Sequence, residues 1–127
     1  MRHRPGGVLD HVLERSLEHL RPLLAEHDDV HLVRLFAELW ALAARDDTVA
    51  AAVRAFYDDY QEQVAAFLHA RHPGLSDAFC QARARMFVML MEGSALFRSG
   101  IAACRTEAAN AQLVAVATTL LRDAVDN

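Results

Sequence analysis

The stretch FCQARARMFVMLMEGSALF, residues 79–97, decides how the chain folds, because apolar side chains surround it almost completely when it is wound as an α-helix. One apolar face consists of Phe79, Ala82, Met86, Met89, Leu90, Gly93 and Phe97. A second face consists of Cys80, Ala84, Phe87, Met91 and Ala95. A helix that is apolar nearly all round has to be buried nearly all round. We therefore expect this helix either at the centre of a monomer's core or between its own domain and a second subunit.

The last helix indicated by the sequence, 106–125, repeats the two-faced pattern more weakly. One face carries Ala109, Leu113, Val116, Ala117 and Leu120. The other carries Ala111, Val114, Thr118, Leu121 and Val125. Two such helices in succession favour a hairpin that pairs with its twin across a two-fold axis, which gives a dimeric four-helix bundle. We predict a homodimer whose interface is made by Phe79, Met86, Leu90, Phe97, Leu113, Val116 and Leu120.

The rest of the sequence also has the helical period, so the fold is predicted to be all-α with five helices. The predicted helices are 8–27, 30–45, 48–70, 77–99 and 106–125. The inner stripe of the second is expected to be Leu32, Leu35, Phe36, Leu39, Leu42 and Ala43. Either Asp46 or Asp47 is expected to cap the third helix, Ser76 to cap the fourth and Gly100 to end it.

The composition is that of one folded domain. Of the 127 residues 54% are hydrophobic and 24% are charged, which excludes a wholly disordered chain. Gly and Pro are too few for the many turns of an all-β fold. We expect a disordered lead-in over 1–7 and a single ligand-binding and dimerisation domain over 8–127.

Charge and hydropathy argue against several kinds of partner. The net charge is -4 and no basic cluster is present, so we expect no nucleic-acid binding by this chain alone. No run approaches the roughly 18 apolar residues of a membrane span, and the N-terminus lacks the apolar region of a signal peptide. Cys80 and Cys104 lie in apolar stretches and are read as free, buried thiols. These features predict a cytoplasmic protein with no membrane association.

Aromatic residues and Met gather on the second, third and fourth predicted helices. Pockets between helices are lined by such side chains, with a few polar groups that orient the ligand. The predicted ligand-pocket residues are Phe36, Trp40, Phe56, Tyr57, Tyr60, Phe67, Arg83, Phe87 and Met91. Ordinary core packing is the alternative interpretation, because any helical core shows aromatic residues at this spacing.

Support for catalysis or metal binding is weak. The sequence has no Gly-rich phosphate loop, nucleophile elbow, HExxH or CxxC motif, so we expect neither an enzyme nor a cofactor. The pairs His27/His31 and His69/His72 have spacings that place two imidazoles on one helical face, but both pairs lie at predicted helix ends, and no metal site is expected. Glu92, a carboxylate inside a very apolar stretch, is expected to pair with an Arg.

The segments LFAELWALAARDD (35–47) and VAAAVRAFYDDY (49–60) resemble the effector-domain helices of TetR-type transcriptional regulators. MLMEGSAL (89–96) is similar to the penultimate helix of that family. The resemblance covers roughly 8–125. It implies an effector-binding and dimerisation domain that senses a small hydrophobic or aromatic molecule between its first four helices.

The sequence departs from the family at its start. The family normally begins with a helix-turn-helix DNA-binding domain, and nothing in 1–7 supplies one. No DNA-contacting residue can therefore be carried over, and the helix 8–27 corresponds to the family's connector helix. The other hypothesis is a stand-alone interaction module without a ligand, which heterodimerises with a full-length regulator.

Overall fold

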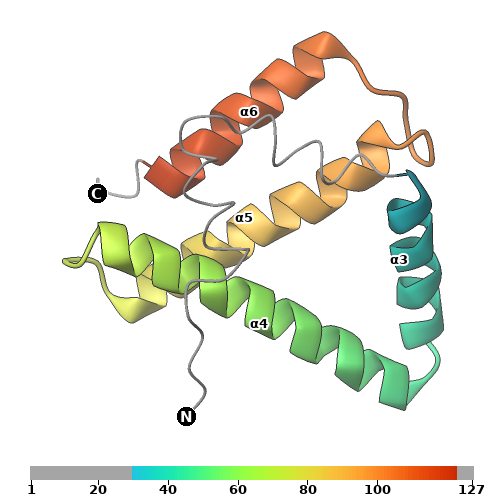
Figure 1. Cartoon of the computed structure of the whole chain (residues 1–127), viewed down its shortest axis with the longest axis horizontal. Helices are drawn as coiled ribbons and strands as arrows, with labels where there is room; N and C mark the ends of the chain where they lie inside the picture. Colours follow the sequence, from blue (N-terminus) through green and yellow to red (C-terminus); the bar gives the residue numbers. More distant parts are fainter. Residues whose placement is uncertain (1–29, 123–127) are drawn as a thin grey trace.

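The computed structural model describes residues 30–122, and over that range the chain is helical, with no strand. Its helices are α3 (Val30–Ala43), α4 (Asp47–Arg71), α5 (Asp77–Arg98) and α6 (Glu107–Arg122) (Figure 1). These correspond to the second to fifth predicted helices, so the all-α class is confirmed for this part of the chain. The predicted lead-in 1–7 and the predicted helix 8–27 lie outside the described residues.

Helix α5 lies between α4 and α6 (Figure 1). The α4–α5 contact is the most extensive, α6 packs along α5, and α3 packs against α4. Helices α3, α4 and α5 outline a triangle, with α3 closing the side away from the α4–α5 turn. Helix α5, which carries the two-faced apolar pattern of 79–97, therefore lies between the other two helices that it contacts. None of the described helices is long and apolar enough to cross a bilayer.

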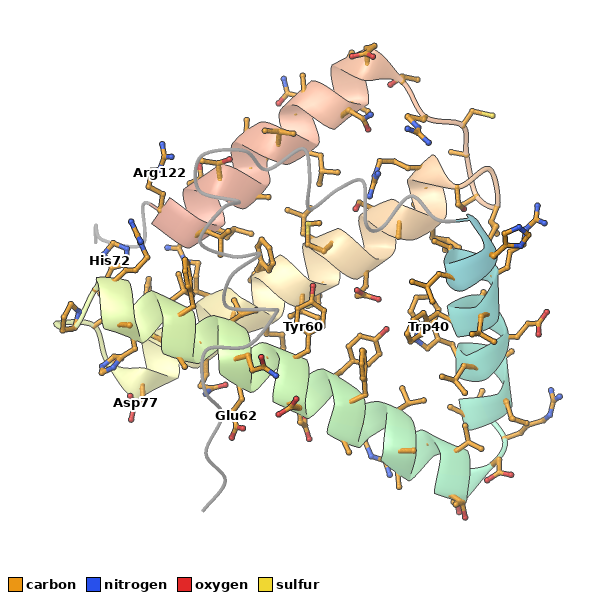
Figure 2. All side chains as sticks on the ribbon, in the orientation of Figure 1. Trp40, Tyr60, Glu62, His72, Asp77 and Arg122 are labelled. Carbon is orange, nitrogen blue, oxygen red and sulfur yellow. The ribbon has the colours of Figure 1, made fainter. Side chains whose placement is uncertain are left out.

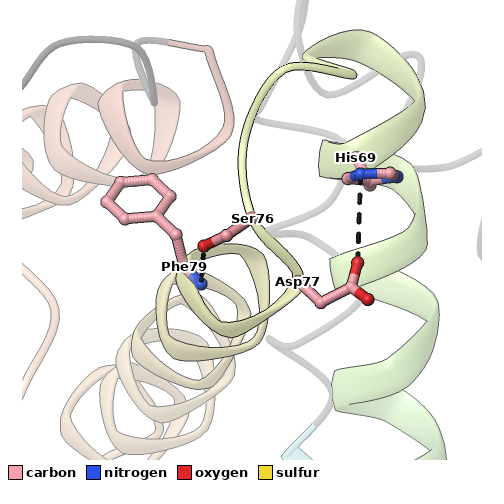
Figure 3. Close-up of polar contacts among 4 residues, drawn as sticks. All are labelled: His69, Ser76, Asp77 and Phe79. Carbon is pink, nitrogen blue, oxygen red and sulfur yellow. Dashed lines mark hydrogen bonds and ion pairs between the residues drawn. The ribbon is translucent and has the colours of Figure 1, made fainter.

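Side-chain caps begin α4 and α5 where the sequence predicts them. The Asp46 carboxylate accepts hydrogen bonds from the backbone N–H groups of Thr48 (2.9 Å) and Val49 (3.1 Å). The Ser76 hydroxyl accepts one from the backbone N–H of Phe79 at 3.1 Å (Figure 3). Each cap satisfies amide donors that have no partner within the first turn of the helix. Both predicted caps are thus confirmed.

A glycine follows the end of α5, and a histidine–aspartate contact lies at the turn between α4 and α5. Gly100 has a φ of +94°, a conformation that residues with a Cβ rarely adopt, and it follows the last turn of α5. At the α4–α5 turn, His69 Nε2 lies 3.9 Å from a carboxylate oxygen of Asp77 (Figure 3). Both side chains are well exposed, so this pair contributes little to stability.

The core lies where the C-terminal half of α4 meets α5 and α6. Its largest fully buried side chains are Phe87, Leu68, Met91, Leu121 and Val64. Smaller residues, Cys80, Ala84 and Ala117, let the three helices approach closely. The second apolar face predicted for 79–97 is therefore the face of α5 that fills this core.

Two sequence expectations are corrected by the fold. Of the predicted inner stripe of α3, Phe36, Leu39 and Ala43 are half-buried, but Leu32, Leu35 and Leu42 are exposed. Val33, which was not predicted to belong to the stripe, is buried. Helix α3 has two apolar faces, and the one that carries its aromatic residues packs on α4.

The second correction concerns the thiols. Cys104 was expected to be buried, but it is exposed in the connection between α5 and α6, whereas Cys80 is buried as expected. Gly100 ends α5 four positions earlier. The apolar run around Cys104 therefore belongs to the connection, where it is open to solvent.

Candidate functional site

Five aromatic residues from α3 and α4 form one connected group, which we call the aromatic cluster: Phe36, Trp40, Phe56, Tyr57 and Tyr60. Trp40 points from α3 and Tyr60 from α4 toward the region that α3, α4 and α5 enclose (Figure 2). All five were predicted as pocket residues.

Helical spacing explains why these rings converge. Phe36 and Trp40 are four residues apart on α3, as Phe56 and Tyr60 are on α4, so each pair shares one face of its helix. Phe36 links the two helices, since its ring centroid lies 6.5 Å from that of Trp40 and 5.8 Å from that of Phe56. The cluster is therefore the contact that joins α3 to α4.

Within α4 the rings meet mostly by edge-to-face contact. Phe56 lies 5.0 Å from Tyr57 and 6.4 Å from Tyr60, both at steep interplanar angles. Tyr57 and Tyr60 are stacked, with centroids 6.5 Å apart. The side chain of Phe56 is still 50% exposed, and the other rings are half-buried. The cluster therefore presents aromatic surface to solvent.

Helix α5 adds a carboxylate to the cluster. The phenol of Tyr57 donates a hydrogen bond of 2.8 Å to Glu92 Oε1. The sequence led us to expect an Arg beside Glu92, and it did not indicate the tyrosine hydroxyl that donates to this carboxylate. Glu92 was not among the predicted pocket residues, because a residue spacing within one helix carries no information about a partner 35 positions away.

Burial and the charge of Glu92 hold both phenols in their protonated form. The pKa of Tyr57 is raised, first by desolvation, then by its hydrogen bond to Glu92 and by the carboxylate's charge, while a hydrogen bond with Trp40 acts in the opposite direction. The pKa of Tyr60 is raised by desolvation, then by the charges of Glu92 and Tyr57. The site therefore combines aromatic faces, tyrosine hydroxyl groups and the side chain of Glu92.

The other predicted pocket residues lie elsewhere. Phe87 and Met91 are fully buried in the core, against which Tyr57 and Tyr60 pack. Phe67 is also a core residue, and the Arg71 guanidinium lies 5.6 Å from its ring centroid.

The remaining polar candidate, Arg83, lies on α5. Its guanidinium is 5.0 Å from the centroid of the Phe79 ring, a cation–π contact within one helix. Nearby, Gln61 on α4 and Gln81 on α5 share a hydrogen bond of 2.8 Å, and Arg85 donates to Gln61 at 2.9 Å. The two glutamines and Arg85 therefore hold α4 against α5. Neither they nor Arg83 belong to the aromatic cluster.

The face of α5 opposite the core is apolar and open in the described part of the chain. We call it the outer face of α5, and it consists of Ala82, Met86, Met89, Gly93 and Phe97. Met86, Met89 and Phe97 are among the most exposed large apolar side chains. Of the other predicted interface residues, Val116 is exposed, whereas Phe79, Leu90, Leu113 and Leu120 are half-buried. The last three pack on the core.

No three His, Cys, Asp or Glu side chains within residues 30–122 are grouped so that they could hold a metal ion. His69 and His72 do not share such a group, and His27 lies outside the described residues.

Comparisons with family models, with curated proteins and with solved structures gave no match to this chain. The interpretation of the site therefore depends on its own geometry.

Proposed function

We propose that this chain is an effector-binding and dimerisation domain of the TetR-like kind, and that it binds a small hydrophobic or aromatic molecule at the aromatic cluster. The observation that carries this proposal is the meeting of rings from α3 and α4 with the Tyr57–Glu92 hydrogen bond. Binding sites between helices combine such apolar lining with a few polar groups that orient the ligand. Phe56, half exposed, would be the ring that first meets the ligand.

The same proposal assigns the outer face of α5 to a second copy of the chain. Met89 and Phe97 are each 58% exposed, and Val116 of α6 is exposed as well. Exposed apolar side chains of this size are typical of interaction sites when they form one patch. A two-fold axis beside α5 and α6 would bury this surface in a four-helix bundle.

Helix α5 would connect the two activities. Glu92 reaches the aromatic cluster, while Met89 and Gly93, on either side of it in sequence, belong to the outer face. A ligand that displaced Tyr57 from Glu92 would therefore act on the helix that makes the dimer contact. In an intact regulator such a shift would change the spacing of two DNA-binding domains.

The alternative is a stand-alone interaction module that heterodimerises with a full-length regulator. The mutual packing of the aromatic rings favours it, because rings 5.0–6.5 Å apart already satisfy one another without a ligand. Under this alternative the outer face of α5 binds the partner protein, and the aromatic cluster only holds α3 against α4.

Ligand binding can be tested at the single tryptophan of the chain, because Trp40 lies in the cluster. In a ¹⁵N NMR titration with tert-butylbenzene and benzyl alcohol, we expect a saturable shift of the Trp40 indole N–H signal. Phe56→Ala should weaken the response, and Leu35→Ala, on the exposed face of α3, should not. A Trp40 signal that neither compound moves would favour the interaction module.

A further inference from the structure

We propose that α5 pairs with α5 of a second copy of the chain in an antiparallel arrangement, about a two-fold axis that passes between Met89 and Leu90. This inference rests on the dimer of the proposed function, and it adds the direction and the register of the two helices. It follows from the order in which large and small residues alternate along the outer face of α5.

The outer face of α5 is uneven. Helical spacing brings Ala82, Met86, Met89, Gly93 and Phe97 to one side of the helix. The two methionines and Phe97 are each more than half exposed. Ala82 and Gly93 are exposed as well, but they are too small to fill the space around them. The face therefore combines three protruding side chains with two recesses, and none of its five residues is charged.

The recess at Gly93 is not explained by packing within the chain. A Cβ at this position would contact no other element of the described chain within 4 Å. Gly93 lies in the interior of α5, where glycine is less favourable than alanine. Glycine permits another group to approach the backbone closely. Since no group within residues 30–122 does so, we assign this close approach to the second copy.

Two-fold symmetry makes the uneven surface complementary to itself. In an isologous contact between antiparallel helices, residues that are equally far from the axis on opposite sides face each other. Met86 and Gly93 are equally far from the midpoint between 89 and 90, and so are Ala82 and Phe97. Met86 would therefore enter the recess at Gly93 of the second copy, and Phe97 the recess at Ala82. Met89 would pack beside its own counterpart near the axis.

Charge also favours the antiparallel arrangement. Arg83 and Arg85 flank the outer face, and the same symmetry sets them opposite the neutral residues Leu96 and Ser94 of the second copy. In a parallel pair every residue faces its own counterpart, so each arginine would lie near another arginine and be repelled by it. A parallel pair would also set large side chains against large ones and leave the recesses empty.

The area of the face agrees with the centre of an interface. A stable interface takes about 800 Å² from each partner. The five residues of the outer face expose roughly 400 Å², within the range of the largest apolar patch on a typical monomer. Helix α6 packs along α5 and exposes Val116, so it can widen the contact. The antiparallel α5 pair would thus form the middle of the dimer contact.

Cysteine cross-linking tests the register on the full chain. All variants carry Cys104→Ser, and the buried Cys80 is kept. On mild oxidation, the double variant Met86→Cys/Gly93→Cys should give at least about fivefold more disulfide-linked dimer than either single variant. A disulfide within one chain is excluded, because helix positions seven residues apart are about 10 Å apart and a disulfide needs Cα atoms within about 7 Å. Ala66→Cys, at an exposed position on α4, measures linking by random collision.

An exchange of large and small residues tests the fit itself, with the dissociation constant measured by sedimentation velocity. Gly93→Met should raise the dimer dissociation constant about tenfold or more, because two large side chains would then meet. Adding Met86→Ala opens the opposite position, and the dissociation constant should return to within about threefold of the original. Adding Val116→Ala instead also removes apolar volume, but away from Gly93, and should not restore dimerisation.

The outcomes separate this inference from the proposed dimer. Disulfide-linked dimer from Met86→Cys alone and from Gly93→Cys alone, as much as from the double variant, would show a parallel or different pairing and overturn the inference while the dimer stands. An unchanged dissociation constant in Gly93→Met would do the same. If the unaltered chain sediments as a monomer, the dimer and the inference fall together. Cross-linking does not depend on Gly93→Met, so the test holds even if that variant fails to fold.

Discussion

The phenol of Tyr57 on α4 donates a 2.8 Å hydrogen bond to the carboxylate of Glu92 on α5, across 35 positions of sequence. The bond lies beside the T-shaped contact of Phe56 with Tyr57, where the aromatic cluster borders the core. It is thus a polar connection between the candidate site and the central helix. Its loss should affect both stability and the environment of Trp40.

Replacing Tyr57 with Phe should lower the free energy of unfolding by about 1 kcal/mol. A hydrogen bond to a charged group contributes more than a neutral one, and the half-buried position of this bond reduces that value. Denaturant unfolding followed by circular dichroism measures the change. Tyr60→Phe is the matched control, because it removes a hydroxyl from the same cluster but leaves the Tyr57–Glu92 bond in place. If both variants lowered the free energy of unfolding by the same amount, the Tyr57–Glu92 bond would contribute no more to stability than the Tyr60 hydroxyl does.

The two tyrosines should lose their phenol protons at a higher pH than free tyrosine does. Both tyrosines of the chain lie in the cluster, and the pKa of each is raised above its ordinary value near 10 by burial and by Glu92. Because the folded state holds these protons more tightly than the unfolded chain, their contribution to stability is complete below pH 10 and is lost as the pH rises above it.

Ultraviolet absorbance of tyrosinate follows this titration directly, with the chain unfolded in denaturant as the reference. We expect ionisation of the folded protein to begin at higher pH and to coincide with unfolding. Glu92→Gln should move the folded titration toward lower pH, since it removes the negative charge that opposes ionisation. Identical curves for the folded and unfolded chains would mean that the phenols are solvated.

Local sequence signals were sufficient for the four described helices and for the caps that begin α4 and α5. The predicted end of the last helix, at 125, lies outside the described residues. The caps at Asp46 and Ser76 involve amides two or three residues away, so they are visible in a short window of sequence. The two apolar faces of α5 were equally visible, because a period of 3.6 residues assigns each position to a face. The structure confirms one of them as the core face that carries Phe87 and Met91.

Choices between two apolar faces were not predictable in the same way. In α3, the predicted inner stripe combined Phe36, which is half-buried, with leucines such as Leu35, which is exposed, and only the position of α4 decides which of them is covered. The Tyr57–Glu92 bond depends likewise on how α4 and α5 lie against each other. Long-range geometry of this kind has no signature in residue spacing. For the same reason, Phe67 was assigned to a pocket but lies in the core.

The two thiols should differ sharply in reactivity. Cys104 is exposed, whereas Cys80 is buried and its pKa is raised by desolvation and then by the charge of Asp77. Since the thiolate is the reactive form, an aromatic disulfide reagent should modify Cys104 quickly in the folded protein and Cys80 only as the structure opens. In denaturant both should react at similar rates. Fast modification of Cys80 in the folded chain would contradict the packing of α5 on the core.

The proposed dimer should be sensitive to charge on the outer face of α5 and at Val116 of α6. Phe97→Arg and Val116→Arg each place a cation at an exposed apolar position, so they should raise the dimer dissociation constant about tenfold or more without unfolding the domain. Sedimentation velocity gives the oligomeric state, and Ala66→Arg on the exposed side of α4 is the control. Leu113 and Leu120 are less suitable targets, because both also pack on the core. An unaltered chain that sediments as a monomer would remove the dimer from the proposal.

Met91 and Met89 give the sharpest comparison of the two faces of α5. They are the same residue type two positions apart, yet the side chain of Met91 is 0% exposed and that of Met89 is 58% exposed. Met91→Ala leaves a cavity in the core that α5 shares with α4 and α6, and it should lower the free energy of unfolding by roughly 2–5 kcal/mol. Met89→Ala should change it by less than about 0.5 kcal/mol at concentrations where the chain is monomeric.

The concentration dependence of Met89→Ala connects this comparison with the dimer. If the outer face of α5 binds a second copy, raising the protein concentration stabilises the unaltered chain by mass action, and Met89→Ala should reduce that gain. Met91→Ala should lower stability at every concentration, because the core of the monomer is what it disrupts. Thermal unfolding over a series of concentrations measures both effects. Equal, concentration-independent losses for the two variants would mean that α5 is buried on both sides within one chain, which is the monomeric arrangement allowed by the sequence of 79–97.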